Sequence, residues 1–118
     1  MIRLKRIYDS AGSDDGHRVL VDRLWPRGVS KSRAALDEWC REIAPGDALR
    51  KWVHADRTQR WEPFCDRYRA ELAQAGDTLD RLAQLAEAPG LTLLTAARDI
   101  EHSHASVLKA LLEGRLAG

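Results

Sequence analysis

Alternating and clustered hydrophobic residues predict three strands, two near the start of the chain and one near its end. In residues 2–8, apolar side chains alternate with basic ones, which is typical of a strand with a partly exposed face at a sheet edge. Residues 9–17 are polar and contain glycine, so a loop follows. The β-branched run in residues 18–22 predicts a second, buried strand, and residues 91–97 predict the third.

Apolar residues recur at helical spacing through the middle of the chain and near its end, which predicts helical segments there. Pro63 lies inside one segment and removes a backbone donor, so we expect a one-turn prelude and a helix that restarts near residues 61–63. The final helix is expected over residues 104–113, with Gly114 as its end. The stripes are Leu36, Trp39, Cys40 and Ile43; Leu49, Trp52 and Val53; Trp61, Phe64, Cys65, Tyr68 and Leu72; Leu79, Leu82 and Leu85; and Val107, Leu108, Leu111 and Leu112.

Residues that commonly begin or end helices separate these segments. The Pro-Gly pair at residues 45–46 ends the first, and Asp47 is a natural N-cap for the second. Asp56 is expected to cap the third. Gly76 is expected to end that helix, and residue 77 or 78 to cap the next.

This order of elements predicts an α/β fold: a single small three-layer domain over residues 1–118, with a short, mostly parallel sheet flanked by helices. Helices that connect strands require crossovers, and crossovers make neighbouring strands parallel. The strands at residues 18–22 and 91–97 are then expected to lie side by side and to point the same way. Their carboxyl ends would bring residues 22–28 close to residues 98–104.

The charge balance gives no strong field that would attract nucleic acid or a membrane. The 118 residues carry a net charge of +1, with 44% hydrophobic and 31% charged residues. Residues 1–33 hold eight basic and four acidic residues, a balance of +4, so a modest basic end is expected. The chain lacks an apolar run of the ~20 residues that a bilayer span needs and the apolar core of a secretion signal, so we expect a cytoplasmic protein.

Several kinds of chemistry lack their usual sequence signature. Cys40 and Cys65 form no C-x-x-C pair and lie among apolar helical positions, so we expect two structural thiols in a reducing compartment. No serine stands in a nucleophile-elbow context, and no phosphate-loop glycine motif occurs. No cofactor is implied, and no metal ligand is assigned in the leading interpretation.

The first candidate site follows the second strand, where charged and aromatic residues are concentrated in a short loop. Arg23 and Arg27 can clamp a phosphate or carboxylate, and Gly28 lets backbone N–H groups approach the same anion. Trp25 either stacks on a ligand or fills a core. Asp22 orients a neighbouring side chain or acts as a base. The alternative is that these charges pair with one another and with acids of the second cluster to fix the loop.

The second candidate site follows the third strand. His102, oriented by Asp99, is expected to carry any proton transfer, and we assign these two as the catalytic candidates. Arg98, His104 and the more distant His54 are candidate ligand-binding residues. A purely structural role in capping the last helix competes with this interpretation.

Residues 21–28, Val-Asp-Arg-Leu-Trp-Pro-Arg-Gly, resemble the signature of the DUF488 family of YeaO-like proteins. Three further segments agree with the same family: residues 42–45, residues 49–54 and residues 96–104. The last of these contains Ala-Ala-Arg-Asp followed by one Glu and two His. The resemblance spans nearly the whole chain and implies a compact α/β domain, but no particular activity. The chain departs from the family pattern at two positions, Thr95, where the pattern has Tyr, and Ser103, where it has Asn.

The leading interpretation is a polar pocket for a small anionic ligand, such as a phosphorylated compound, at the carboxyl edge of the sheet. Arg23 and Arg27 would hold the anion. If there is catalysis, hydrolysis by water that His102 and Asp99 activate is the simplest mechanism.

Two alternatives remain open. A metal-dependent hydrolase would use His54, His102 and His104, although residues two apart at a helix start point away from each other. A non-catalytic nucleic-acid or protein-binding module would use Trp25 and the basic residues of the N-terminal part. Those basic residues are Arg3, Lys5, Arg6, Arg18, Arg23, Arg27, Lys31 and Arg33.

Overall fold

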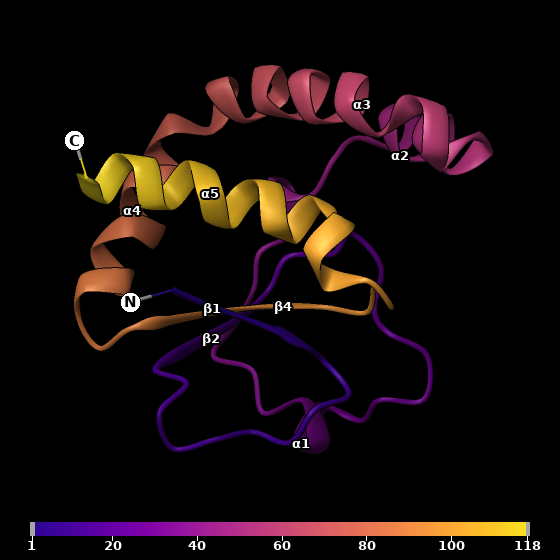
Figure 1. Cartoon of the computed structure of the whole chain (residues 1–118). Coiled ribbons are helices and arrows are strands. Elements are labelled where there is room, and N and C mark those ends of the chain that lie inside the picture. The colour runs from indigo at the N-terminus through magenta and orange to yellow at the C-terminus, as the bar shows by residue number, and fades with distance from the viewer. Residues whose placement is uncertain (1, 118) are drawn as a thin grey trace.

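Four parallel strands form one sheet in the computed structural model, which describes residues 2–117 (Figure 1). Their spatial order is β1-β4-β2-β3, and each neighbouring pair is parallel. The expected edge position of the first strand and the expected parallel pairing of the next two are confirmed, whereas β3 was not predicted. The strands are β1 (Ile2–Arg6), β2 (His17–Leu20), β3 (Glu38–Trp39) and β4 (Leu91–Thr95).

β4 is central, and all five of its residues are buried. Successive side chains of a strand point to opposite faces of the sheet, so β4 contributes to a core on each side. Leu93 joins the larger core under the helices, and Leu94 joins a smaller core on the other face. Val19 and Leu20 of β2 divide in the same way. A continuous apolar run is typical of a parallel strand that is covered on both faces.

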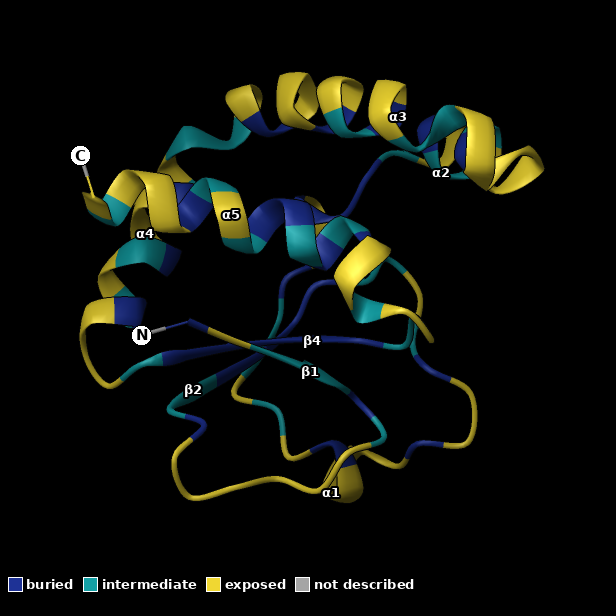
Figure 2. Ribbon diagram, viewed as in Figure 1, coloured by how far each residue is buried: buried dark blue, intermediate teal, exposed yellow. Residues whose placement is uncertain are grey.

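The two faces of the sheet are covered unequally (Figure 1). α4 and α5 pack on one face, α3 packs on α5, and α2 packs on α3. The opposite face carries the one-turn α1 and neighbouring loops, much of whose length is exposed (Figure 2). The α/β class is confirmed, and loops make up most of its third layer. The helices are α1 (Lys31–Ala34), α2 (Asp47–Ala55), α3 (Arg57–Leu72), α4 (Gly76–Glu87) and α5 (His104–Ala117), with the 3₁₀ turns η1 (Arg41–Ile43), η2 (Ala73–Ala75) and η3 (Ile100–His102).

Within residues 2–117, no helix combines the length and the apolar character that crossing a membrane requires.

The helix expected over residues 36–43 does not form. Trp39 lies in β3 instead, opposite Leu20 of β2, and the Cys40 N–H donates to the Leu20 carbonyl at 2.9 Å. The indole N–H of Trp39 donates to the carbonyl of Asp22 at 2.8 Å. Apolar residues three and four apart fit a helix, but they also fit a short strand followed by a tight turn. Pairing with β2 satisfies the backbone groups here, so the strand forms.

The interruption expected at Pro63 is absent, because α3 runs unbroken from Arg57 to Leu72. Pro63 and Gln59, which lies four residues earlier, are both exposed. The Gln59 carbonyl that loses its N–H partner therefore has access to water, which reduces the cost of a proline inside the helix. The expected cap is confirmed, since the Asp56 carboxylate accepts from the Gln59 N–H at 3.2 Å.

Three further helix boundaries differ from the expectation. Gly76 begins α4 rather than ending α3, and α5 continues through Gly114 to Ala117. A Cβ at either glycine would meet nothing within 4 Å, so both stand at open positions of a helix. Asp47 is the first residue of α2, and Gly46 occupies the N-cap position.

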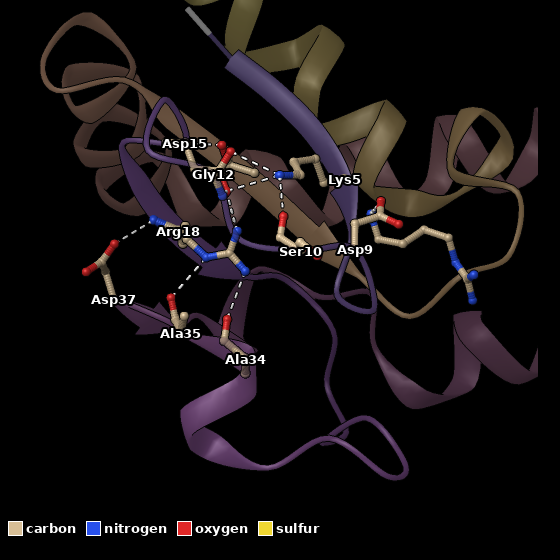
Figure 3. A network of polar contacts seen from close by, with 11 residues as sticks. Lys5, Asp9, Ser10, Gly12, Asp15, Arg18, Ala34, Ala35 and Asp37 are labelled. Carbon is tan, nitrogen blue, oxygen red and sulfur yellow. Dashed lines mark hydrogen bonds and ion pairs between the residues drawn. The ribbon is translucent and has the colours of Figure 1, made fainter.

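A buried polar network joins the sheet to the layer that α1 and its neighbouring loops form (Figure 3). Arg18 of β2, which is 5% exposed, forms an ion pair with Asp15. Its guanidinium also donates to the carbonyls of Ala35 at 3.0 Å and Ala34 at 2.9 Å, at the end of α1. Lys5 of β1 lies 3.2 Å from the Asp15 carboxylate. The network thus joins two strands, the loop between them and α1.

Candidate functional site

The carboxylate of Asp22 links the ends of two neighbouring strands. Asp22 follows β2, and its two oxygens accept hydrogen bonds from Thr95 Oγ1 at 2.7 Å and from the Ala96 N–H at 2.8 Å, both at the end of β4. This contact exists because β2 and β4 are parallel neighbours, so their carboxyl ends lie at the same edge. The expected approach of the carboxyl ends of these two strands is confirmed at this residue.

His104, the first residue of α5, completes the environment of this carboxylate. Its Nε2 lies 3.1 Å from Asp22 Oδ1 and 3.0 Å from the carbonyl oxygen of Val21. Both neighbours are acceptors, so Nε2 carries the proton. The imidazole therefore joins the start of α5 to the end of β2.

Burial and hydrogen bonding act in opposite directions on Asp22. Desolvation alone would raise the pKa of its carboxyl. The hydrogen bond and charge of His104, with the donors of Ala96 and Thr95, outweigh this effect and hold the pKa below its ordinary value. Asp22 is accordingly a carboxylate with several partners, which come from the end of β4 and the start of α5.

Asp22 and His104 contribute to a cavity of about 230 Å³, which we call the inner cavity. Sheet-end residues and the first residues of α5 form one side, and residues of α2 and α3 form the other. The lining combines charged, aromatic and small residues. It consists of Asp22, Pro45, Arg50, Val53, His54, Arg57, Trp61, Phe64, Thr95, Ala97, His102, Ser103 and His104.

Two arginines make the inner cavity electropositive. Arg50 of α2 is 3.5 Å from the exposed carboxylate of Asp47, but its Nε is buried without a hydrogen-bond partner among the described residues. Arg57 of α3 donates from Nη2 to the carbonyl oxygen of His102 at 3.0 Å. Among the described residues of the lining, Asp22 is the only acidic one, and the donors around it already engage both of its oxygens.

The pKa of His54 is affected by both arginines. Its pKa is lowered, first by partial loss of hydration and then by the charges of Arg57 and Arg50. An imidazolium is disfavoured where nearby positive charges are uncompensated. An anion in the inner cavity would reverse that effect.

A more open hollow of about 480 Å³, which we call the outer compartment, adjoins the inner cavity. Arg57, Trp61 and His102 line both spaces. Thr58, Arg98 and Asp99 complete the outer compartment.

The two catalytic candidates are paired in the outer compartment. His102 Nδ1 lies 3.1 Å from Asp99 Oδ2, and both side chains are more than 60% exposed. Because Asp99 accepts, Nδ1 carries the proton, and Nε2 is the nitrogen that remains available. The pair has the geometry of an oriented base, but it lies where water has free access.

The loop after β2 mostly faces away from these spaces. Arg23 donates to the carbonyl of Pro45 at 3.3 Å and lies 3.7 Å from an Asp47 carboxylate oxygen. Arg27 is exposed, and its side chain forms no hydrogen bond or ion pair with residues 2–117. Neither arginine lines the inner cavity or the outer compartment, so the expected clamp is not assembled there.

Trp25 and Gly28 also lie outside the two spaces. The Trp25 indole donates to the Val29 carbonyl at 2.7 Å and packs edge-on against Trp39, with ring centroids 5.3 Å apart. It therefore belongs to the smaller core. Gly28 has a φ of 74°, and a Cβ added there would meet no atom within 4 Å, so backbone conformation rather than crowding explains the glycine.

The structure removes part of the basis for the two alternatives, a nucleic-acid or protein-binding module and a metal-dependent hydrolase. Arg18 is buried and Lys5 pairs with Asp15, so neither adds to a basic surface. His54, His102 and His104 line the same cavity but do not form a metal-type cluster. Within the described part of the chain, the one group of three ligand atoms within 4.8 Å of one another belongs to Glu38, Cys40 and Glu42.

Three residues, Arg50, Arg57 and Trp61, are not predicted from the sequence to belong to the site; Trp61 is expected there only as part of an apolar helical stripe. Arg50 precedes His54 by four residues and so lies on the same face of α2, a signal that would have identified it. Arg57 and Trp61 share the same spacing in α3. Nothing in the local sequence, however, indicates that α3 begins beside the carboxyl edge of the sheet.

Thr95 and Ser103, where the chain departs from the family pattern, both line the inner cavity. Thr95 donates its hydroxyl hydrogen to Asp22, and Ser103 donates to the carbonyl of Ile100 at 2.7 Å. Cys40 is fully buried, and burial followed by the nearby Glu42 raises the pKa of its thiol to about 12. None of these three groups is poised as a nucleophile.

Comparison with known proteins assigns the whole chain to one family. The family described as the inactive DUF488-N3 subclade matches residues 1–118. Uncharacterized protein YeaO of Escherichia coli strain K12 is 48% identical over 107 residues, covering 91% of this chain and 92% of that protein. Uncharacterized protein Rv3073c of Mycobacterium tuberculosis strain H37Rv is 40% identical over 114 residues, covering 97% and 95%. No solved structure shows a significant match.

Proposed function

The chain belongs to the DUF488 family, in the subclade described as inactive, and on that premise we propose that its inner cavity binds a small anionic ligand without transforming it. Such a protein would act as a binding module. The anion would be held by Arg50 and Arg57 of α2 and α3, in place of the arginines of the loop after β2.

The buried, unpartnered Nε of Arg50 carries this proposal. A buried donor without an acceptor costs about 1–3 kcal/mol, so native structures rarely keep one without a compensating role. Arg50 lines the inner cavity, and a rotation of its guanidinium would bring this N–H to a phosphate or carboxylate oxygen there. His54 lies close enough to both arginines that their charges, after partial burial, lower the pKa of its imidazole.

No hydroxyl of the described lining is free to act as a nucleophile, which disfavours catalysis through a covalent intermediate. The hydroxyls of Thr95 and Ser103 are engaged within the protein. The description of the subclade as inactive points the same way.

Thermal unfolding in inorganic phosphate tests the proposal, with chloride at matched ionic strength as the reference. A ligand that binds the native state alone stabilises it by about 2.7 kcal/mol at a hundred times its Kd, so the melting temperature should rise. Arg50→Gln and Arg57→Gln should each abolish the rise. Arg27→Gln removes the same charge outside the cavity and should keep it. An equal rise in all four proteins would show non-specific stabilisation and contradict the proposal.

A hydrolase remains the second candidate, because Asp99 orients His102 and leaves Nε2 facing the outer compartment or solvent. Hydrolysis of p-nitrophenyl phosphate or an equivalent ester that disappears in His102→Gln would favour it. Binding without turnover in the wild-type protein would favour the binding module.

A further inference from the structure

The inner cavity and the outer compartment share three lining residues, which makes them two parts of one space. We propose that this space takes an anion that carries a flat ring, with the charged group among Arg50, Arg57 and His54 and the ring against Trp61. The inference rests on the proposed function, since it names the class of anion that the same site binds.

The sizes of the two spaces favour a ligand larger than a simple inorganic anion. The inner cavity, at about 230 Å³, is smaller than the ~300 Å³ at which pockets for organic ligands usually begin. The outer compartment adds a wider, open space that starts at Arg57 and Trp61. A ligand with one compact charged end and one broader end fits this shape.

Trp61 is the residue that suits a ring. Its indole stacks on Phe64, with centroids 5.5 Å apart and planes 22° apart, and His102 contacts it edge-on at 5.8 Å. These contacts fix the indole on two sides. Phe64 lines only the inner cavity, whereas Trp61 also lines the outer compartment, so part of the indole surface remains available there. A fixed, partly exposed aromatic side chain is the usual platform on which planar ligands stack.

The shape of the two spaces sets the orientation. Each space is lined by two arginines and one carboxylate, and Arg57 is common to both. The narrow inner cavity takes the compact charged end, since the ring needs the part of the Trp61 indole that lines the wider outer compartment. Thr58 and Arg98 then offer polar contacts to substituents at the outer end.

Isothermal titration calorimetry with three probes tests this arrangement: inorganic phosphate, ethyl phosphate and phenyl phosphate. The last two carry the same charged group and differ in the ring. Stacking typically contributes about tenfold or more in affinity. We expect wild-type protein to bind phenyl phosphate about tenfold more tightly than ethyl phosphate.

Single substitutions test whether Trp61 causes the preference for phenyl phosphate over ethyl phosphate. Trp61→Leu should remove the preference, so that ethyl phosphate and phenyl phosphate bind with equal affinity, and Trp61→Phe should retain part of it. Trp52→Leu is the matched control, because Trp52 lies against Arg60 and Arg67 and lines neither space. The chemical shift of the Trp61 indole N–H in the wild-type protein gives the same information without a substitution, since phenyl phosphate should move it more than ethyl phosphate does.

The outcomes separate the two proposals. Equal affinity of wild-type protein for ethyl and phenyl phosphate would overturn the proposal that the ligand carries a ring, while leaving the proposal of anion binding intact. A ring preference that survives Trp61→Leu would overturn the assignment of Trp61. Failure of all three probes to bind would instead overturn the proposed function itself.

Discussion

Asp22 Oδ1 accepts a hydrogen bond from Nε2 of His104 at 3.1 Å, so the end of a central strand directly fixes the first residue of the C-terminal helix. The carboxylate also holds the end of β4 through Thr95 and Ala96. One side chain thereby sets the spacing of three elements that bound the inner cavity. This relationship makes Asp22 a positioning residue whose loss should affect stability and shape together.

Replacing Asp22 with asparagine should lower the free energy of unfolding by roughly 1–3 kcal/mol, because His104 loses a charged acceptor in a mostly buried position. Urea denaturation measures the change. Asp99→Asn removes the same charge from the exposed pair with His102 and should cost less than about 0.5 kcal/mol. Equal costs for the two substitutions would contradict the structural role of Asp22.

Acid should destabilise the protein partly through the same carboxyl. The pKa of Asp22 in the folded protein lies below its ordinary value of 3.8, so the unfolded chain binds the proton more tightly. The stabilisation is therefore present above that ordinary value and is lost as the pH falls through the lower folded pKa. Urea midpoints measured from pH 6 downward should fall less steeply for Asp22→Asn than for wild type. Parallel curves would show that Asp22 titrates normally.

Arg18→Met should destabilise the fold by about 3 kcal/mol, because it removes one of the two cationic partners of the buried Asp15 and the donor to the last carbonyls of α1. Thermal and urea unfolding provide the measurement. Arg27→Met, at an exposed position, should change stability by less than about 0.5 kcal/mol. The double variant Asp15→Asn/Arg18→Met should be less destabilised than the sum of its single variants, and strict additivity would indicate that the pair is not coupled.

The two thiols should differ in reactivity. Cys40 is fully buried, and burial together with Glu42 raises the pKa of its thiol to about 12, whereas Cys65 is half-buried. Mass spectrometry after treatment of native protein with iodoacetamide should find Cys65 modified first. Both should react in denaturant, and Cys65→Ser should make the native protein unreactive. Early modification of Cys40 would require an opening of the sheet edge that the structure does not contain.

The part of the site that depends on strand order was predictable from the sequence. The β-branched run before Asp22 and the apolar run before Thr95 identify two buried strands, and parallel pairing brings their ends together. The position of His104 near the same edge was also predictable, because it lies a few residues beyond the second apolar run. The convergence therefore needed only strand order and the rule that connected parallel strands end at the same edge.

The helical side of the site could not be predicted in this way. Arg50, Arg57 and Trp61 reach the sheet edge because α3 packs on α5 and α2 packs on α3, which are contacts between distant segments. Trp39 shows the same limit on a smaller scale, since its spacing fits a helix until a hydrogen-bonding partner becomes available in β2. Local periodicity identifies which residues are apolar, whereas tertiary pairing decides which structure buries them.

The strand order also has a consequence for how the chain is made. β1 begins at Ile2, but its partner β4 begins only at Leu91. At ~5–20 residues per second, ribosomal synthesis separates the two by on the order of ten seconds. During that interval the nascent chain holds β1 and β2 without their shared neighbour. Messages truncated before β4 would therefore release polypeptides with unpaired strand edges, which chaperones and proteases would be expected to remove.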